Sequence, residues 1–263
     1  MPLISVVTSV HNGEAYLKEC VDSVLNQTFQ DFEYIILNNG STDRTSEILE
    51  EYKDPRLRVV HQENLGIPKS LNKGASICSA ELIAHLDADD YVYPQWLEKI
   101  YDFLSKNKDI VLCGSRFEEL FNGKLYPQVY PFLEHDYEIR KSLCFVNPIP
   151  HSFTIIRKSP FFKVGVYDPN IITVHDYDLW IRLLGEGKGH TLNQILGVCR
   201  RHDSSFSTKK ERTMIKELFK VQWKAYTRLG GDFWKMARSL LRRGIALFLP
   251  FVVRSKIRAS LRK

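Results

Sequence analysis

Apolar segments and helical segments alternate four times across residues 4–106, and this alternation most strongly constrains the fold. Short apolar runs predict strands over residues 4–7, 32–37, 57–61 and 82–86. Apolar residues at helical spacing predict helices over residues 14–27, 41–52, 67–79 and 94–106. Such alternation is typical of a parallel sheet covered by helices on both faces. We therefore expect an α/β fold with a mostly parallel sheet flanked by helices.

Polar side chains follow three of these strands at their carboxyl ends. Ser9 and His11 follow the first strand, Asn39 follows the second, and the sequence Asp-Ala-Asp-Asp at residues 87–90 follows the fourth. In open parallel sheets, ligands bind in the crevice outside the carboxyl ends of the strands. The sequence therefore predicts one ligand site that these loops share.

The pattern becomes less regular from about residue 111. The sequence predicts a loop at residues 145–151, a short helix at 176–184 and a short strand at 195–199. The best candidate for a boundary is the polar stretch 204–210. We therefore divide the chain into one domain at residues 1–208 and a helical, basic C-terminal region at residues 209–263.

The acidic cluster at residues 87–90 directly follows an apolar strand. Asp87 and Asp89, held at a strand end, can bind a hard divalent cation that also contacts substrate phosphates. Such a cation would offset the charge of a diphosphate leaving group. The same short pattern is also typical of a solvated acidic turn, with Asp90 capping the helix predicted at residues 94–106. Taken alone, this motif leaves both interpretations open.

Three later residues are candidates for chemistry at the same site. Asp176, at the start of a predicted helix, can act as a general base on an acceptor hydroxyl or can cap the helix. His202 can serve as a metal ligand, and Arg200 can hold diphosphate oxygens. Taken alone, His202 and Arg200 are also compatible with ordinary surface positions, as Asp176 is with a helix cap.

Several common classes of function find no support. The chain lacks the glycine-rich dinucleotide motif and the P-loop, and it lacks a nucleophile elbow. The basic residues of the first 208 positions are not clustered with aromatic residues, which disfavours nucleic-acid binding. Five widely spaced cysteines disfavour a disulfide framework or a zinc site and fit a reducing cytoplasm. The N-terminus predicts a strand and not a signal peptide.

In their order along the chain, these motifs resemble those of the family 2 glycosyltransferases, which have the GT-A fold with its Rossmann-like sheet. The matching segments are residues 5–13 (SVVTSVHNG), 23–28, 38–43 (NNGSTD), 64–66, 71–74, 87–90 (DADD), 175–180 (HDYDLW) and 200–202 (RRH). One such motif alone would be weak evidence for the resemblance, whereas eight motifs in the expected order and spacing are specific evidence. The resemblance covers about residues 3–206.

The resemblance implies an inverting transfer of a sugar from a nucleoside diphosphate donor, with UDP favoured, to a hydroxyl of a glycan or lipid-linked acceptor in cell-surface polysaccharide synthesis. It implies a divalent Mg²⁺ or Mn²⁺ ion, with Asp87, Asp89 and His202 as ligands. Asp176 matches the catalytic base of the family. The positions that match donor-binding residues are Ser9, His11, Asn39, Asn72, Asp87 and Arg200.

The chain departs from the common family pattern at three positions. Asn38 and Asn39 replace two aspartates, and an amide carries no charge to offer the nucleobase. Leu71 stands where many members have arginine, and Lys69 is our candidate for its replacement. His175 stands where an acidic residue is common, and a protonated histidine there would lower the pKa of Asp176.

The C-terminal region is strongly basic. Residues 209–263 hold sixteen Lys and Arg against three Asp and Glu, a net charge of +13, which leaves −7 for residues 1–208. The apolar run at 244–253 is too short for a membrane span, which needs about 20 residues. Its flanking basic residues predict an interfacial segment on anionic lipid, and a basic helix pair packed on the domain is the alternative. We expect a cytoplasmic enzyme, peripheral at the inner face of the cytoplasmic membrane.

Two other functions compete with the transferase. A nucleotidyltransferase also uses paired aspartates, but it needs a glycine-rich, basic loop after the first strand, and residues 9–13 do not match one. A catalytically inactive GT-A domain that binds nucleotide sugars as a scaffold is the second alternative, and the Asn38-Asn39 pair supports it.

Overall fold

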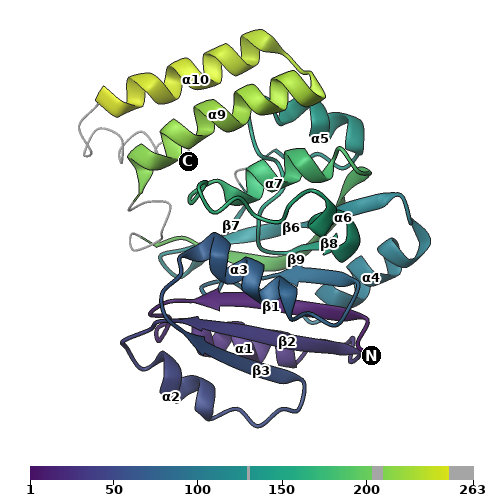
Figure 1. The fold of residues 1–263 in the computed structure, drawn as a ribbon, viewed down its shortest axis with the longest axis vertical. Helices are drawn as coiled ribbons and strands as arrows, with labels where there is room; N and C mark the ends of the chain where they lie inside the picture. Colours follow the sequence, from purple (N-terminus) through teal and green to yellow (C-terminus); the bar gives the residue numbers. More distant parts are fainter. Residues whose placement is uncertain (129–130, 203–209, 249–263) are drawn as a thin grey trace.

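The structure of the protein is a computed structural model, and it describes residues 1–128, 131–202 and 210–248. Within these ranges the chain forms one nine-stranded sheet with helices on both faces (Figure 1). The strand order is β3-β2-β1-β4-β8-β6-β9-β5, with β7 paired to β6.

The four predicted N-terminal strands are confirmed, and they pair in parallel in the order β3-β2-β1-β4. They are β1 (Ile4–Val10), β2 (Phe32–Asn39), β3 (Leu57–Gln62) and β4 (Leu82–His85). The connecting helices are α1 (Leu17–Leu25), α2 (Thr45–Glu50) and α3 (Ile67–Ser76). The register pairs Val10 with Asn38, so the loops that follow β1 and β2 begin side by side.

The second half of the sheet is mixed in direction. Its strands are β5 (Tyr91–Val92), β6 (Ile110–Phe121), β7 (Lys124–Pro127), β8 (Thr154–Arg157) and β9 (Lys188–Arg200). β8 runs antiparallel between β4 and β6, whereas β6 and β9 are parallel. The parallel arrangement that the sequence predicts is therefore confined to the N-terminal strands and the β6–β9 pair. An apolar run shows where a strand lies but not its direction, which depends on the edge to which the chain returns.

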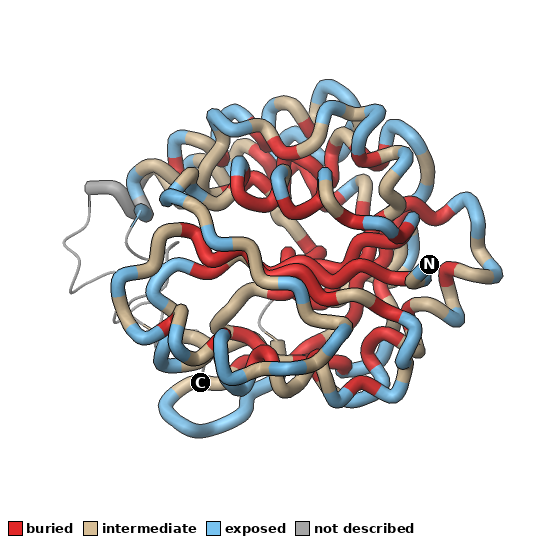
Figure 2. Tube along the Cα trace, turned by 60° about the horizontal axis from the view of Figure 1, so that its bottom comes forward, coloured by how far each residue is buried: buried red, intermediate tan, exposed pale blue. Residues whose placement is uncertain are grey.

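Alternation along the central strands builds two cores on opposite faces of the sheet. Successive side chains of a strand point to opposite faces. Val7 and Ile35 accordingly belong to one buried cluster, whereas Val6 and Ile36 belong to the other. Figure 2 shows the buried strands running between two outer layers of chain. The second cluster packs beneath α1 and α4 (Trp96–Lys106).

The first cluster lies beneath α3 and the helices of the C-terminal half. These are α5 (Asp136–Ser142), α6 (Lys158–Lys163), α7 (His175–Leu183), α9 (Glu211–Leu229) and α10 (Phe233–Phe248). Leu218 and Val221 of α9 are buried in the same cluster as residues of the sheet. Gln222 of α9 also donates a hydrogen bond to the carbonyl of Phe145, at 2.9 Å.

The C-terminal region therefore contributes two packed helices to the core of the domain (Figure 1). This matches the alternative given above, a basic helix pair packed on the domain. Most of the apolar run at 244–253, and the basic residues after it, lie outside the residues whose side chains the structure describes. No described helix is both long and apolar enough to cross a membrane.

One glycine sets how closely α3 approaches the sheet. A Cβ atom on Gly74 would lie 2.7 Å from Val7 Cγ1 and 2.8 Å from Leu37 Cδ2. Both side chains are fully buried and have little room to move. The glycine of the segment at residues 71–74 is thus explained by packing, because any side chain there would push α3 away from β1 and β2.

We predict that Gly74→Ala lowers the free energy of unfolding. Overpacking costs ~1–3 kcal/mol, which exceeds the ~1 kcal/mol that alanine gains over glycine in a helix. Gly244→Ala is the matched control, since its Cβ would meet only Phe219 at 4.0 Å. Denaturant melts should show a lower midpoint for Gly74→Ala alone; equal midpoints would contradict the packing argument.

Candidate functional site

The loops at the carboxyl ends of β1, β2 and β4 carry most of the residues that the sequence predicts for the site. Ser9 donates a hydrogen bond to the hydroxyl of Ser70 on α3, at 2.8 Å. His11 Nδ1 lies 3.0 Å from the carbonyl oxygen of Asn39, and because that oxygen can only accept, Nδ1 carries the proton. The Nε2 atom of a neutral His11 is therefore an acceptor.

Asn39 is buried and organises its neighbours. Its Oδ1 accepts hydrogen bonds from Gln62 Nε2 and from the backbone N–H of Leu65, both at 2.9 Å. Its exposed fraction is 2%. The side chain predicted to hold the nucleobase thus orders the segment at residues 62–66.

Asn38 uses both ends of its amide in hydrogen bonds around the turn after β2. Its Nδ2 donates to Ser46 Oγ at 2.8 Å and lies 3.2 Å from His61 Nδ1. Its Oδ1 accepts the backbone N–H of Ser41 at 3.3 Å. The Ser46 hydroxyl and the His61 imidazole can each also donate a hydrogen bond, so these contacts accommodate an aspartate as well as an asparagine.

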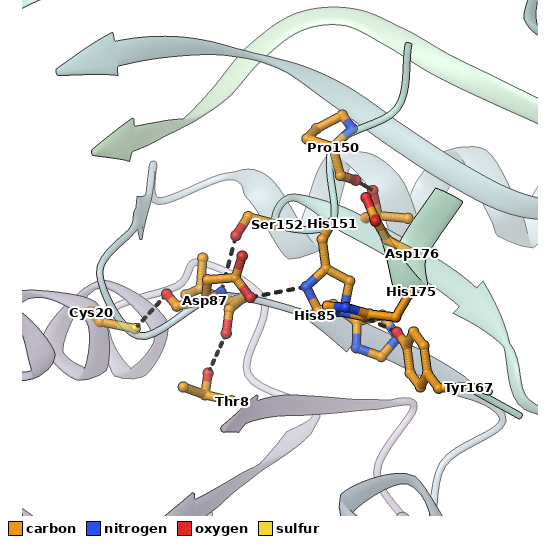
Figure 3. Close-up of polar contacts among 12 residues, drawn as sticks. Thr8, Cys20, His85, Asp87, Pro150, His151, Ser152, Tyr167, His175 and Asp176 are labelled. Carbon is orange, nitrogen blue, oxygen red and sulfur yellow. Dashed lines mark hydrogen bonds and ion pairs between the residues drawn. The ribbon is translucent and has the colours of Figure 1, made fainter. Parts of the chain in front are cut away.

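Asp87 forms an ion pair that the sequence did not predict. Its Oδ1 lies 2.9 Å from Nδ1 of His151, which comes from the loop before β8 (Figure 3). Burial raises the pKa of Asp87, but the imidazole of His151 outweighs burial and lowers that pKa below its ordinary value. Burial lowers the pKa of His151, and the Asp87 carboxylate reverses this and raises it. Both effects favour the charged pair.

From the sequence, His151 belongs to the predicted loop at residues 145–151, whose residues 147–151 are expected to contact the acceptor, and no pairing with Asp87 is predicted. Its partner Asp87 lies 64 positions away along the chain, and no spacing within either motif links the two. The only available signal was a histidine between a proline and a serine just before an apolar strand.

Asp89 and His202 are brought together, as the resemblance implies. Asp89 Oδ2 lies 2.9 Å from His202 Nε2, although the two residues are 113 positions apart. The ring of His202 also packs against that of Tyr16, with 5.1 Å between centroids. A carboxylate and an imidazole are donors that suit a divalent transition-metal ion such as Mn²⁺.

The three proposed metal ligands do not form one cluster. Asp89 pairs with His202, whereas Asp87 pairs with His151. Across residues 1–128, 131–202 and 210–248, no group of three or more His, Cys, Asp and Glu side chains is arranged to hold a metal ion. The Asp89–His202 pair fits an ion that takes its remaining ligands from substrate phosphates and water, as Mg²⁺ does in many enzymes.

Arg200 ties the end of β9 to the acidic cluster. Its Nε donates to the carbonyl of Asp89 at 3.1 Å, and its backbone N–H donates to Asp90 Oδ1 at 2.8 Å. The guanidinium pairs with Glu19 and lies 4.5 Å above the ring of Tyr16. Arg200 is therefore held at the site, beside the turn that carries Asp89.

The expectation that Asp90 caps the next helix is wrong. α4 begins after Gln95 and has no side-chain cap. Asp90 is buried, and it bonds to the backbone of Arg200 in a strand far along the chain. Burial, followed by the charges of Asp89 and Asp87, raises the pKa of Asp90 well above its ordinary value.

Asp176 lies in the first turn of α7, at the same end of the sheet. Its Oδ2 accepts a hydrogen bond from Asn147 Nδ2 at 3.0 Å, so the loop before β8 also orients this carboxylate. Figure 3 places Asp176 on the far side of His151 from Asp87. A carboxylate so held can accept a proton from a hydroxyl that enters the site.

His175 does not supply the positive charge considered from the sequence. Burial, followed by the charge of His151, lowers the pKa of His175. Its Nδ1 lies 3.3 Å from the carbonyl of Ile172. The neutral imidazole packs against His151, with ring centroids 5.3 Å apart.

Asn72 uses both ends of its amide on one backbone segment. Nδ2 donates to the carbonyl of Tyr167, and Oδ1 accepts the N–H of Tyr167, each at 2.9 Å. The predicted donor contact at Asn72 is therefore occupied by the protein itself. Leu71 beside it is buried in the core, whereas Lys69 is exposed.

Comparison with known proteins agrees with this geometry. The family model described as "Glycosyl transferase family 2" matches residues 5–165. The chain belongs to glycosyl transferase family 2. An uncharacterized glycosyltransferase of Methanocaldococcus jannaschii is 32% identical over 251 residues, which cover 89% of this chain and 85% of that relative.

Two solved structures share the fold of this family 2 chain. Staphylococcus aureus TarS (residues 1–349), solved in complex with UDP-GlcNAc, superposes with a TM-score of 0.72 at 17% sequence identity. The match covers 97% of this chain and 78% of the TarS chain. The mannosyltransferase PcManGT of Pyrobaculum calidifontis, in complex with GDP-Man and Mn²⁺, superposes with a TM-score of 0.63 at 13% sequence identity. The match covers 98% of this chain and 79% of the PcManGT chain. The fold is therefore the GT-A fold that the motifs predict.

Proposed function

We propose that this family 2 protein is an inverting, metal-dependent glycosyltransferase that moves a sugar from a nucleoside diphosphate, with UDP favoured, to an acceptor hydroxyl. One observation carries the proposal: the Asp89–His202 pair and the Asn147-oriented Asp176 lie at the same end of the sheet, since the end of β4 pairs with the start of β8. The Asp89–His202 pair suits a departing diphosphate, and the Asp176 carboxylate suits an entering nucleophile.

Asp176 is the proposed general base. It accepts the proton of the acceptor hydroxyl while that oxygen forms a bond to the anomeric carbon. The bond from that carbon to the diphosphate oxygen breaks on the opposite face, so a single displacement inverts the configuration. No second carboxylate nucleophile is required, in contrast to retaining glycosidases. Asn147 keeps the base directed at the site through its bond to Oδ2.

Asp89 and His202 are the proposed holders of a divalent ion. When bound, Mg²⁺ or Mn²⁺ would offset the charge that develops on the diphosphate. The Mn²⁺ complex of PcManGT supports this assignment. Asp87 is proposed as the donor contact beside that pair, with Arg200 holding the turn that carries Asp89.

The nucleobase is proposed to lie against the loops after β1 and β2. His11 Nε2 is an acceptor there, because Nδ1 donates to Asn39. An acceptor suits the imino N–H of uracil, as an aspartate would at that place. The UDP-GlcNAc complex of TarS supports a UDP donor. His11 thereby supplies the acceptor that the buried Asn39 does not offer.

The acceptor is proposed to be a glycan or a lipid-linked sugar at the inner face of the cytoplasmic membrane. The support lies on either side of the α9–α10 turn, in the last turns of α9 and the first turn of α10. There the rings of Trp223, Tyr226, Phe233 and Trp234 follow one another at 5.6 to 6.0 Å. Trp223 is 54% exposed and Trp234 is 77% exposed. Exposed aromatics on basic helices are typical of segments that lie in the headgroup region of anionic membranes.

An inactive scaffold protein is the less favoured function. It was supported by Asn38 and Asn39, whose amides are both hydrogen-bonded within the protein. The acidic residues proposed for chemistry are all present and oriented. We therefore propose an active transferase built on this variant of the turn.

We predict that Asp176→Asn lowers the rate of transfer by about 10²–10⁴-fold, the usual contribution of a general base. The amide can still accept the bond from Asn147, so binding of UDP with Mn²⁺ should not change. A thermal-shift screen of UDP-, dTDP- and GDP-sugars first identifies the donor, and release of the nucleoside diphosphate then measures turnover. Asp102→Asn, on the exposed side of α4, is the control. Near-normal turnover in Asp176→Asn would remove this residue from the base role.

We predict that EDTA abolishes transfer and that Mn²⁺ or Mg²⁺ restores it. Asp89→Asn should raise the concentration of Mn²⁺ needed for half-maximal activity, because one charged ligand is lost. The measurement is a metal titration of turnover in both proteins. Activity that is insensitive to EDTA would contradict the assignment of Asp89 and His202.

We predict that the full chain sediments with vesicles of phosphatidylcholine and phosphatidylglycerol, and less with phosphatidylcholine alone. Replacing Trp223 and Trp234 together by Ser should weaken binding to the mixed vesicles. A matched control replaces Phe162 and Leu125, two exposed apolar residues elsewhere, by Ser. If both double variants bind like the wild type, the α9–α10 turn is not the membrane contact.

A further inference from the structure

A chain of hydrogen bonds runs from α3 through the core to the donor-side carboxylate of Asp87. Figure 3 shows its part from Tyr167 through His151 to Asp87. Asn72 holds the backbone of Tyr167 with two bonds of 2.9 Å. The Tyr167 hydroxyl lies 3.0 Å from His151 Nε2 and 3.2 Å from His85 Nε2. His151 Nδ1 then lies 2.9 Å from Asp87 Oδ1. Four elements of the fold thus converge on one carboxylate.

Every bond in this chain has a partner of the right kind. A tyrosine hydroxyl can donate one hydrogen bond and accept another, and the two imidazole nitrogens supply both partners. Tyr167 and His85 are fully buried, and His151 is 9% exposed. The side chain of Asp87 is 49% exposed. The chain therefore leads from a closed interior to a carboxylate that faces solvent.

Packing alone does not explain why these polar side chains are buried. Burying imidazole and phenol groups costs free energy unless every polar atom is paired. His85 Nδ1 and His175 Nε2 are buried without a partner in the structure. Apolar residues of similar volume would fill the same space without this penalty. A role in orienting Asp87 accounts for the polar residues, which packing does not.

We propose that His151 is the positioning residue of the donor-side carboxylate, and that the Tyr167 hydroxyl and Asn72 hold His151 in place. The inference rests on the proposed function, because it assigns Asp87 to the donor side. His151 engages Oδ1 of Asp87, and among the described residues no hydrogen bond or ion pair engages Oδ2, which is thereby left for the donor. Neither His151 nor Tyr167 is proposed to react.

The segment that carries Tyr167 and the loop that carries His151 also hold the proposed base, Asp176. Tyr167 lies in the segment that leads into α7, whose first turn carries Asp176. Asn147, in the loop of His151, donates to Asp176 Oδ2 at 3.0 Å. The chain therefore couples the donor-side carboxylate to the acceptor-side carboxylate through shared backbone.

Tyr167→Phe is the sharpest test, because it removes one hydroxyl and keeps the ring. We expect the Kd for UDP with Mn²⁺ and the KM for the donor to rise about fivefold, the worth of one buried hydrogen bond, with a smaller change in kcat. Tyr177→Phe is the matched control. It removes another buried hydroxyl of the same core, which donates to the carbonyl of Leu143, and it should lower the melting temperature similarly but leave Kd unchanged.

Substitution of His151 provides a second test. In His151→Asn the amide nitrogen takes the place of Nδ1 and keeps a donor for Asp87, so this variant should retain more affinity for UDP with Mn²⁺ than His151→Leu. In an Asp87→Ala background, Tyr167→Phe should cause no further loss, since the carboxylate that it positions is absent.

Two results would overturn the inference: an unchanged Kd and KM in Tyr167→Phe, or additive effects of Tyr167→Phe and Asp87→Ala. A wild-type chain that binds no nucleoside diphosphate with Mn²⁺ would overturn the proposed function, and the inference with it. Normal wild-type binding together with an unaffected Tyr167→Phe would reject the positioning role alone.

Discussion

The parallel pairing of β1 with β2 and β4 is the constraint on which the site depends. Parallel strands end at the same edge of the sheet, so the loops after them meet there. The register of Val10 with Asn38 begins the first two loops side by side, and Gly74 lets α3 pack closely enough to support both strands. The acidic cluster after β4 then lies at the same edge.

Around this edge, side chains from the mixed half of the sheet complete the site. The loop before β8 supplies His151 to Asp87 and Asn147 to Asp176, and the end of β9 supplies Arg200 and leads to His202. Each proposed carboxylate is thus oriented by a segment distant in the chain.

Particular residues show how far sequence reasoning reached. The alternation of apolar and helical segments predicted β1 to β4 because periodicity is a local property. The proximity of Asp89 to His202 followed from the resemblance of whole motifs. The pairing of His151 with Asp87 was missed because the two residues lie 64 positions apart in the chain. Asp90 was assigned to the wrong partner because the sequence does not show whether the backbone N–H that its carboxylate accepts belongs to a nearby helix or to a distant strand.

The sequence by itself determined the strand–helix order, the acidic cluster at residues 87–90 and the basic character of the C-terminal region, all of which are written in composition and spacing. Only the tertiary structure decided the direction of β8, the packing of α9 into the same core, and the pairs that Asp87 and Asp89 form. The physical reason is that hydrogen bonds and ion pairs of this kind act over a few ångströms in space, and their partners here lie 64 to 113 residues apart in the chain.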